Sequence, residues 1–354
     1  MLDDKPRPMP TATIHDLAER CGVSIATISR ALNGMPGVGE RTRKRILDAA
    51  QEIDYRPSAA ARTLVTRRSQ ILGVVIDTGD GRPNLQHPFF QHVLVGFQQE
   101  AHAQSFDLLL FARDRTACGA ESRLLNRCRQ HRIDGIAVIA FDLTDPGADA
   151  LTLPGIPCVA LDIDVDPATT AVVSSDNAGG AALATRHLHE LGRRRIAVIA
   201  GDRTTKPGRE RLRGHLDELE RLGLPRREEY VRGGDFYSDS GAEEMAALLA
   251  LPEPPDAVFC ATDLMAAGAL QAARSAGVEV PGDVAIAGFD GLDLTDLTHP
   301  RITTVRQDKR GLGVVAARTL LSMLADPDAP PPSVTLPVEL VVRESSAGPA
   351  AAEP

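Results

Sequence analysis

The 354-residue sequence lacks the marks of membrane, secreted and metal-stapled proteins. No stretch approaches the roughly 18 consecutive apolar residues that cross a membrane. The first residues, MLDDKPRPMP, contain no apolar signal-peptide core. The five cysteines are scattered and form no C-x-x-C pair, which disfavours a disulfide framework or a zinc site. We therefore expect a cytoplasmic protein with reduced thiols and no membrane partner.

The sequence also lacks the common signatures of catalysis. There is no G-x-G-x-x-G after the first expected strand, no G-x-x-x-x-G-K-[ST] phosphate loop and no G-x-S-x-G elbow. The glycine-rich residues 311–317 lack the last glycine of the dinucleotide fingerprint. His187 and His189 point to different faces of a helix, which disfavours a metal site. We expect no enzyme, cofactor or metal ion.

Charge is unevenly distributed along the chain. The net charge is −9, yet residues 1–70 hold 12 basic and 8 acidic residues, against 27 and 40 in the remainder. A basic head on an acidic body is typical of a chain with a nucleic-acid-binding arm. The length favours two or three domains, since it is too great for one small core.

Residues 13–33, TIHDLAERCGVSIATISRALN, have the pattern of two short helices joined by a tight turn. The apolar residues of the first helix recur at helical spacing: Ile14, Leu17, Ala18 and Cys21. Ser24 stands where the N-cap of the second helix belongs. In that helix the inner residues are Ile28, Ala31 and Leu32, and the outer face comprises Ile25, Ala26, Ser29, Arg30 and Asn33. The pattern predicts a helix-turn-helix.

A third helix is expected from about Glu40, with Gly39 as its cap. Its inward residues are Ile46, Ala49, Ala50 and Ile53. A basic cluster near its start opposes the helix dipole and suggests a phosphate-facing role: Arg41, Arg43, Lys44 and Arg45.

From residue 70, apolar runs rich in Val and Ile alternate with helical stretches. The expected strands are residues 71–77, 107–112, 135–141, 157–163, 195–201, 257–263 and 284–290. Alternation of this kind predicts βαβ units with parallel sheets, in two α/β lobes or one large one. The ends, residues 1–10 and 345–354, are expected to be disordered. Between head and body lies RPSAAARTL, residues 56–64, an alanine-rich stretch able to form only a marginal helix.

The chain resembles the lactose/galactose repressor (LacI/GalR) family of bacterial transcriptional regulators from about Thr13 to Glu344. The motifs that carry the resemblance are the helix-turn-helix above, YRPSAAARTL, IAVIAGDRTTKPGRERLRG, FCATDLMAAGAL, VPGDVAIAGFD and PRITTVRQDKRGLG. The resemblance implies a DNA-binding head, a hinge helix and a two-lobed core like that of periplasmic sugar-binding proteins. The implied divisions are residues 11–56 for the head, 57–68 for the hinge, 69–174 with 306–333 for the N-terminal subdomain, and 175–305 with 334–344 for the C-terminal subdomain.

The resemblance also implies which residues meet DNA. The second helix is expected to enter the major groove, with Ile25 and Ala26 setting operator preference and Arg30 donating to guanine. Phosphate contacts are expected from Ser24, Thr27, Ser29 and Asn33. In the hinge, Ala61 would approach the minor-groove floor, Arg62 would meet groove or backbone acceptors, and Leu64 would wedge between base steps.

A ligand is expected beyond the carboxyl ends of the core strands, where Asp162, Asp263 and Asp290 stand. An alternative role for Asp263 is as the N-cap of the next helix. The family pattern adds Arg211, with Arg209 as an alternative, and further residues at Phe89, Phe90, Phe236 and Gln307. Two positions depart from that pattern, since His87 and Thr262 replace the usual Asn.

The predicted function is that of a ligand-responsive repressor that binds a palindromic operator in double-stranded DNA as a homodimer. A sugar-like effector is the first expectation and a purine or nucleoside the second. The alternatives from other classes are a sugar receptor without DNA function, and an enzyme.

Overall fold

The computed structural model describes residues 12–32, 34–55, 68–76, 85–111, 120–139, 155–166, 168 and 170–347, without the side chains of 120–123. The chain divides into two compact units, residues 1–69 and 70–354. The expected hinge helix lies almost wholly outside the described residues. Within the described ranges, no helix is both long and apolar enough to cross a membrane.

The described residues of the first unit form three helices around a small core. They are α1 (Ile14–Cys21), α2 (Ile25–Leu32) and α3 (Glu40–Glu52), as the apolar spacing predicted. Gly22 ends α1 with φ at 59°, a left-handed conformation that glycine adopts without strain. The Ser24 hydroxyl accepts a 3.2 Å hydrogen bond from the Thr27 N–H and so caps α2. The core residues with no exposed surface are Leu17, Ile28 and Ile46.

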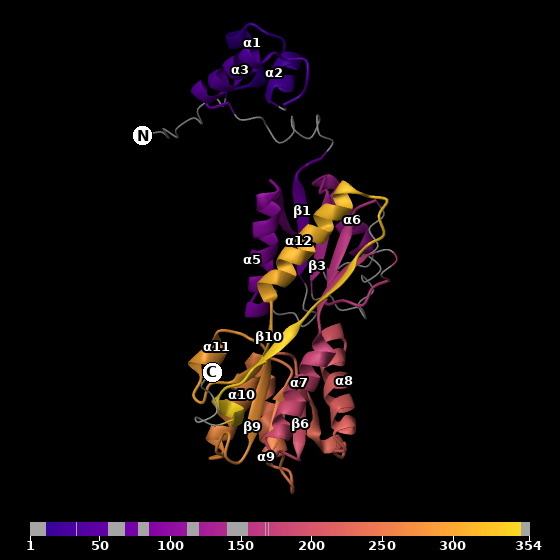
Figure 1. The fold of residues 1–354 in the computed structure, drawn as a ribbon, viewed down its shortest axis with the longest axis vertical. Helices are drawn as coiled ribbons and strands as arrows, with labels where there is room; N and C mark the ends of the chain where they lie inside the picture. The colour runs from indigo at the N-terminus through magenta and orange to yellow at the C-terminus, as the bar shows by residue number, and fades with distance from the viewer. Residues whose placement is uncertain are drawn as a thin grey trace, which may run out of the picture. The chain divides into compact units, whose positions relative to one another are not determined.

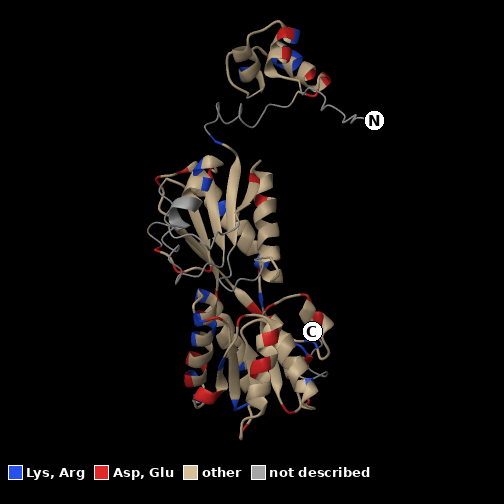
Figure 2. Ribbon diagram, turned by 180° about the vertical axis from the view of Figure 1, so that it is seen from behind, with Lys and Arg blue, Asp and Glu red and all other residues tan. Residues whose placement is uncertain are grey.

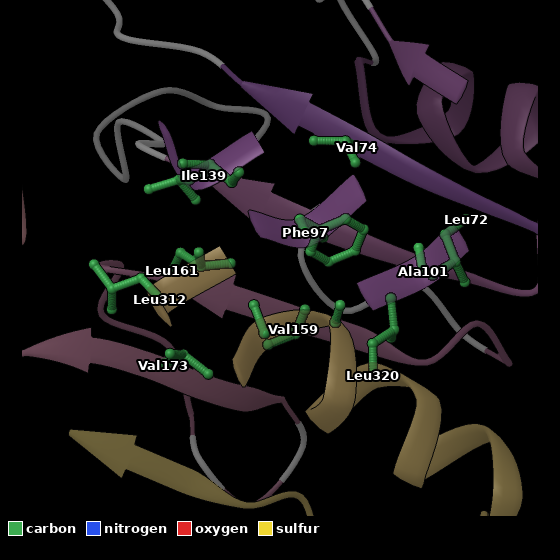
Figure 3. Close-up of a cluster of buried hydrophobic side chains, with 14 of the residues drawn as sticks. Leu72, Val74, Phe97, Ala101, Ile139, Val159, Leu161, Val173, Leu312 and Leu320 are labelled. Carbon is green, nitrogen blue, oxygen red and sulfur yellow. The ribbon is translucent and has the colours of Figure 1, made fainter. Parts of the chain in front are cut away.

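The first lobe of the second unit is a parallel sheet between helices, in the order β11-β5-β4-β3-β1-β2. Its strands are β1 (Ile71–Ile76), β2 (Asp107–Phe111), β3 (Gly135–Ile139), β4 (Cys158–Leu161), β5 (Ala171–Ser175) and β11 (Ser333–Leu336). Helices α5 (Pro88–Ala103) and α12 (Lys309–Ala325) cover one face and α6 (Ala120–Gln130) the other (Figure 1). In Figure 3, Phe97 of α5 and Leu312 and Leu320 of α12 lie against the sheet.

Helices α5 and α12 join residues more than 200 positions apart in the sequence. Gly313 of α12 allows the close approach, because a Cβ there would lie 1.9 Å from the carbonyl oxygen of Val93. The return of the chain to the first lobe is therefore fixed by backbone contact between these helices.

The second lobe repeats the architecture with the strand order β12-β10-β9-β8-β6-β7. Its strands are β6 (Ile196–Ala200), β7 (Val231–Gly233), β8 (Ala257–Cys260), β9 (Ala285–Asp290), β10 (Thr303–Gln307) and β12 (Val338–Val341). Only β12 is antiparallel to its neighbour. Helices α7 (Asn177–Glu190) and α8 (Lys206–Arg221) cover one face, and α9 (Ser238–Leu249) and α10 (Asp263–Ser275) the other (Figure 1). The short helices are η2 (Glu228–Tyr230), α11 (Leu294–Leu297) and α13 (Glu344–Ala347).

The chain passes between the lobes three times, and each passage lies later than expected. Strand β5 ends in the first sheet at Ser175, and β10 stays in the second sheet to Gln307. Strand β11 belongs to the first sheet as far as Leu336, so the third passage is at Pro337 rather than after residue 333. The expected boundaries at 174, 305 and 333 are corrected accordingly, because strand pairing continues to the end of each of these strands.

Most charged residues of the two lobes lie on helices and loops at the surface. Figure 2 shows Lys, Arg, Asp and Glu mainly on helices and connecting loops, while the strands of both sheets are largely uncharged. The central strands, such as β3, β6 and β9, are buried on both faces, as expected for parallel sheets covered by helices. Charged residues that do enter the interior therefore need a specific reason.

Candidate functional site

The exposed face of α2 is the candidate DNA-contacting surface of the head. Ile25, Ala26 and Arg30 are exposed, whereas Thr27 and Ser29 are partly buried. Because Ile28 and Ala31 face the core, Ile25, Ala26 and Arg30 lie on the outer side of the helix. Exposure of a large apolar residue such as Ile25, at 40%, leaves it available for contact with another surface. Asn33 and the three hinge residues Ala61, Arg62 and Leu64 lie outside the described residues.

The basic cluster of α3 is used partly within the head. Arg43 donates a 2.6 Å hydrogen bond to the carbonyl oxygen of Met35, and Arg45 donates one of 3.1 Å to that of Cys21. Arg45 thereby ties α3 to the end of α1, a structural role that the sequence did not indicate. Arg41 and Lys44 remain exposed.

The surplus of positive charge in the N-terminal region does not come from these helices. Residues 12–55 hold six basic and six acidic residues. The segment 56–68 holds four arginines and no acidic residue. This segment, called the linker below, therefore accounts for the positive surplus of the first 70 residues.

The second unit contains a cavity of about 100 Å³ between its two lobes. This volume corresponds to roughly seven to ten water positions. Its walls come from both lobes: His87, Phe89, Phe90, Ile139, Leu161, Asp162 and Leu312 from the first, and Asp202, Thr205, Pro207, Arg211, Asp235, Phe236, Tyr237, Thr262 and Asp290 from the second. Six of the eight residues expected to contact a ligand lie in these walls.

Arg211 of α8 occupies the floor of the cavity and is only 3% exposed. Its Nη1 donates to the carbonyl oxygen of Ala261 at 2.6 Å and to Asp290 Oδ1 at 3.2 Å. Its Nε donates to Asn177 Oδ1 at 2.9 Å, and its guanidinium lies 3.8 Å from the centre of the Phe289 ring. A buried cation held by a carboxylate, two further acceptors and an aromatic face is well compensated for its loss of water.

Asp290, the last residue of β9, lies in the same floor of the cavity. Besides Arg211, its Oδ1 accepts a 2.7 Å hydrogen bond from Gln307 Nε2. Lys309 stands behind it and donates to the main-chain oxygens of Asp290 and Gly291. Gln307 itself is 2% exposed and lies outside the cavity walls, so it contacts Asp290 rather than the cavity. The expectation that Gln307 touches a ligand directly is corrected to a supporting position.

Asp162 faces Asp290 and Arg211 from the first lobe. Its Oδ1 accepts a 3.1 Å hydrogen bond from Asn177 Nδ2, which also donates to Glu210 Oε2 at 3.3 Å. Burial raises the pKa of Asp162 to about 6, and the charge of Arg211 partly opposes that rise. Asn177, at the first passage between the lobes, thus joins Asp162 of one lobe to Arg211 of the other.

Aromatic rings line the cavity from both lobes. His87 caps α5 through a 3.3 Å hydrogen bond from the Phe89 N–H to its Nδ1, and its ring lies 5.7 Å from Phe90 and 5.6 Å from Tyr237. Phe236 lies across the end of β6, where a Cβ on Gly201 would fall 1.9 Å from its ring. A side chain at position 201 would push this ring out of place.

Three cavity residues have a left-handed backbone. The φ angles are 51° for Asp162, 73° for Phe236 and 115° for Asp290. Non-glycine residues rarely adopt such angles, and when they do the surrounding structure must impose them. Because all three lie around one cavity, we infer that the position of their side chains is maintained there at the cost of an unfavourable backbone conformation.

Two sequence expectations are corrected. Asp263 is the first residue of α10 rather than the end of a strand, and it is fully buried outside the cavity walls. It accepts hydrogen bonds from Thr304 Oγ1 at 2.6 Å and Leu292 N at 2.7 Å, while Thr262 provides the N-cap. Burial and nearby Asp290 raise the pKa of Asp263 well above its usual value. Arg209, the alternative to Arg211, pairs with Asp164 outside the cavity walls.

Several residues in or beside the cavity walls had no distinguishing signal in the sequence. Asn177 follows a strand, as many helix-starting residues do, and Tyr237 merely adjoins Phe236. Asp202 and Thr205 belong to the loop after β6, and the sequence indicated only that they follow the end of an expected strand. All four become notable only when the two lobes are placed together.

Comparison with known proteins matches both units. Residues 13–58 match the model of bacterial regulatory proteins, lacI family, and residues 185–346 match the periplasmic binding protein-like domain. The chain is 32% identical to the HTH-type transcriptional repressor PurR of Actinobacillus pleuropneumoniae serotype 3, over 94% of this chain and 98% of that one. It is 34% identical to the HTH-type transcriptional regulator CelR of Thermobifida fusca, with the same coverage.

Solved structures give the same result over nearly the whole length. The transcriptional regulator CelR–cellobiose complex is similar with a TM-score of 0.72 and 31% identity, covering 94% of this chain and 99% of that one. The lac repressor dimer bound to operator and the anti-inducer ONPF has a TM-score of 0.83 and 27% identity, covering 96% and 99%. These relatives are regulators rather than enzymes. The chain belongs to the lacI family of bacterial regulatory proteins.

Proposed function

We propose that this protein is a transcriptional repressor that binds a two-fold symmetric operator as a homodimer and responds to a sugar-like effector. The observation that carries the proposal is one chain that joins a helix-turn-helix to a cavity walled by two lobes. The lac repressor relative was solved as a dimer on its operator, and the CelR relative with cellobiose.

On DNA, the exposed face of α2 enters the major groove. Ile25 and Ala26 offer apolar contact, which suits the methyl group of thymine, and Arg30 can donate two hydrogen bonds to one guanine. Ser24, Thr27, Ser29 and Asn33 would contact the phosphates, and such contacts fix the register of the helix without reading sequence.

The basic linker supplies the second part of the interface. Four arginines between residues 56 and 68 favour a phosphate-lined groove, and the alanines allow two symmetry-related copies to lie close together. Leu64 is the bulky apolar side chain suited to separate base steps, with Ala61 and Arg62 beside it in the groove. A helix this short is marginal in water and becomes stable only with DNA and the right spacing of the cores.

The ligand acts through the two lobes. Because both lobes contribute walls, a ligand binds most tightly to one relative placement of them, and it changes DNA affinity by its differential affinity for the two placements. Phe89, Phe90 and Phe236 would pack against the ligand, while Asp162, Arg211 and Asp290 would bond its polar groups. Asp263 and Gln307 would support these from behind.

A purine or nucleoside is the second candidate ligand. The aromatic side chains on both walls suit a planar ring, and PurR repressors are among the relatives. A thermal-shift screen with sugars and nucleosides separates the two classes, because only the cognate class raises the melting temperature.

The proposed function is tested by a mobility-shift assay. The full chain is mixed with DNA from upstream of its own gene, with and without the sugars and nucleosides. Specific binding that one compound alters is expected. Equal affinity for cognate and scrambled DNA under every condition would refute the proposal. A protein that binds genomic DNA in a bacterium works in the cytoplasm, and we propose that location.

A further inference from the structure

Asn177 lies where the chain first passes from one lobe to the other. It follows β5 of the first sheet by two residues and is the first residue of α7 in the second lobe. The residue is only 1% exposed. A buried side-chain amide is costly unless its oxygen and its two N–H groups are hydrogen-bonded, so the partners of Asn177 decide what it does.

The orientation of this amide is fixed by the chemistry of its partners. Arg211 Nε can only donate, so the atom 2.9 Å from it is the amide oxygen. Ionised carboxylates can only accept, so the amide nitrogen faces Asp162 at 3.1 Å and Glu210 at 3.3 Å. The carbonyl oxygen of Ser175 is a third acceptor, 3.3 Å from the same nitrogen. The opposite orientation would set a donor against Arg211 and an acceptor against two carboxylates.

The three acceptors belong to different parts of the core. Asp162 follows β4 in the first lobe, Glu210 lies on α8 in the second, and Ser175 ends β5 at the passage itself. The amide nitrogen carries two hydrogens, so three acceptors share two donors. If Asp162 moves away with the first lobe, Glu210 and the Ser175 carbonyl can accept both hydrogens. The amide therefore has partners whether the lobes lie together or apart.

Two carboxylates, one from each lobe, meet at this amide. Burial raises the pKa of Asp162, and the charge of Glu210 adds to the rise. The charges of Arg211 and Lys206 oppose it, and Lys206 also pairs with Glu210. By donating to both carboxylates, the Asn177 amide offsets their mutual repulsion. A donor at this point is therefore what allows the two lobes to approach here.

We propose that Asn177 is a positioning residue that couples closure of the two lobes to the floor of the cavity. With the lobes together, its amide joins Asp162 to Arg211. With the lobes apart, the freed hydrogen passes to Glu210 or to the carbonyl oxygen of Ser175. A ligand that contacts both Asp162 and Arg211 stabilises the first arrangement. The inference deepens the proposed function and rests on it only in taking this cavity as the effector site.

Asn177→Asp tests the coupling with the smallest change of shape. It keeps the oxygen that faces Arg211 but replaces the donor between Asp162 and Glu210 by an acceptor. The ratio of closed to open chain should fall about tenfold or more at pH 8, because a hydrogen bond to a charged group is lost and a third like charge is added. Protonation of any one of the three carboxylates restores a donor. The variant should therefore close again as the pH falls toward about 5, more steeply than the wild type.

Closure is measured in the full chain, without ligand or DNA, as the distance between two spin labels. Gln130→Cys of α6 and Glu220→Cys of α8 place one label at an exposed position of each lobe. The four cysteines that the structure describes are buried, and Cys118 is replaced by Ser in every protein. Labelled chain is diluted with unlabelled chain, so that each oligomer carries one labelled pair.

Two further variants separate the coupling from a general loss of structure. Asn126→Asp is the matched control, since it makes the same replacement at an exposed position of α6 outside these contacts, and its distances should equal those of the wild type. Exchange of the two groups, Asn177→Asp with Asp162→Asn, places a donor beside the new carboxylate and should restore much of the closed population at pH 8.

Wild-type distances in Asn177→Asp at pH 8 overturn the inference. Opening that neither acid nor the exchange of the two groups reverses also overturns it. If Asn177→Asp has no cooperative unfolding transition, Asn177→Ala takes its place, because it removes the amide without adding charge. This variant should also open the chain at pH 8, and wild-type distances in it would be equally decisive against the coupling.

Failure of this inference is distinguishable from failure of the proposed function, because the distance measurement involves neither operator nor ligand. Specific operator binding by a chain whose lobes ignore the Asn177 variants would retain the regulator and discard the coupling residue. The expected opening in a chain without specific operator binding would do the reverse.

Discussion

Replacing Arg211 by Met should destabilise the ligand-binding core severely. The guanidinium and its partner carboxylate, Asp290, are 4% and 2% exposed. Methionine retains much of the apolar stem but leaves the carboxylate buried without its cation. Breaking a buried ion pair in this way typically costs about 3–5 kcal/mol in the free energy of unfolding.

Scanning calorimetry of the full chain measures the effect on the core transition. A loss of about 3–5 kcal/mol should lower the melting temperature by roughly 6–10 °C in a domain of this size. The double variant Arg211→Met/Asp290→Asn should recover much of the loss, since the unpaired charge is gone, with a coupling free energy of about 2 kcal/mol or more.

An exposed ion pair provides the control for this cycle. Arg226 and Glu228 form a 3.2 Å pair whose side chains are 57% and 80% exposed. Arg226→Met should therefore cost under about 1 kcal/mol. If Arg211→Met costs no more than the control, the reasoning about the buried pair is wrong.

Three further predictions concern other parts of the chain. Arg30→Ala should relax base preference at one symmetric operator position, with about 1–3 kcal/mol less discrimination in binding to single-base operator variants. Leu64→Ala should weaken operator binding at least tenfold while ligand affinity, measured by calorimetry, stays constant. Glu218→Gln should cost about 1–3 kcal/mol at pH 7, because hydrogen bonds from Arg221 and Arg186 lower the Glu218 pKa to about 2. That stabilisation is complete above pH about 4.5 and disappears as the pH falls toward 2, so melting curves of the two proteins should converge in acid.

The three-helix head could be predicted closely because its signals are local. Helical spacing of Leu17, Cys21 and Ile28 and the cap at Ser24 involve residues within one or two turns of each other. What the sequence did not indicate was Arg45 donating to Cys21, a contact between residues 24 positions apart. The charge of Arg45 suggested a phosphate contact, but in the fold its guanidinium donates to the carbonyl oxygen of Cys21.

Strand prediction found the seven longest apolar runs but missed five short strands among the described residues, namely β5, β7, β10, β11 and β12. All seven expected strands occur, with ends that differ by at most three residues where the chain is described. Strand β10 reads TTVRQ and β12 reads VELV, short segments whose pairing depends on partners far along the chain. Their placement decides the second and third passages between the lobes, so the expected domain boundaries shifted with them.

The cavity was partly predictable for a physical reason. In open α/β sheets ligands bind beyond the carboxyl ends of the strands, and Asp162 and Asp290, each at such an end in its own sheet, line the same cavity as expected. Asp263 shows the limit of that rule, because its carboxylate turns inward to Thr304 and Leu292. Asn177 matters through contacts with both lobes, and no local pattern carries that information.

The central claim is that a ligand in the cavity changes the affinity of the head for its operator. The most direct measurement is fluorescence anisotropy of the full chain on its own upstream DNA, with and without a saturating ligand found by the thermal-shift screen. We predict sequence-specific binding whose Kd changes at least about tenfold, equivalent to a coupling of about 1.4 kcal/mol. An identical Kd with the cavity empty and saturated would contradict the account.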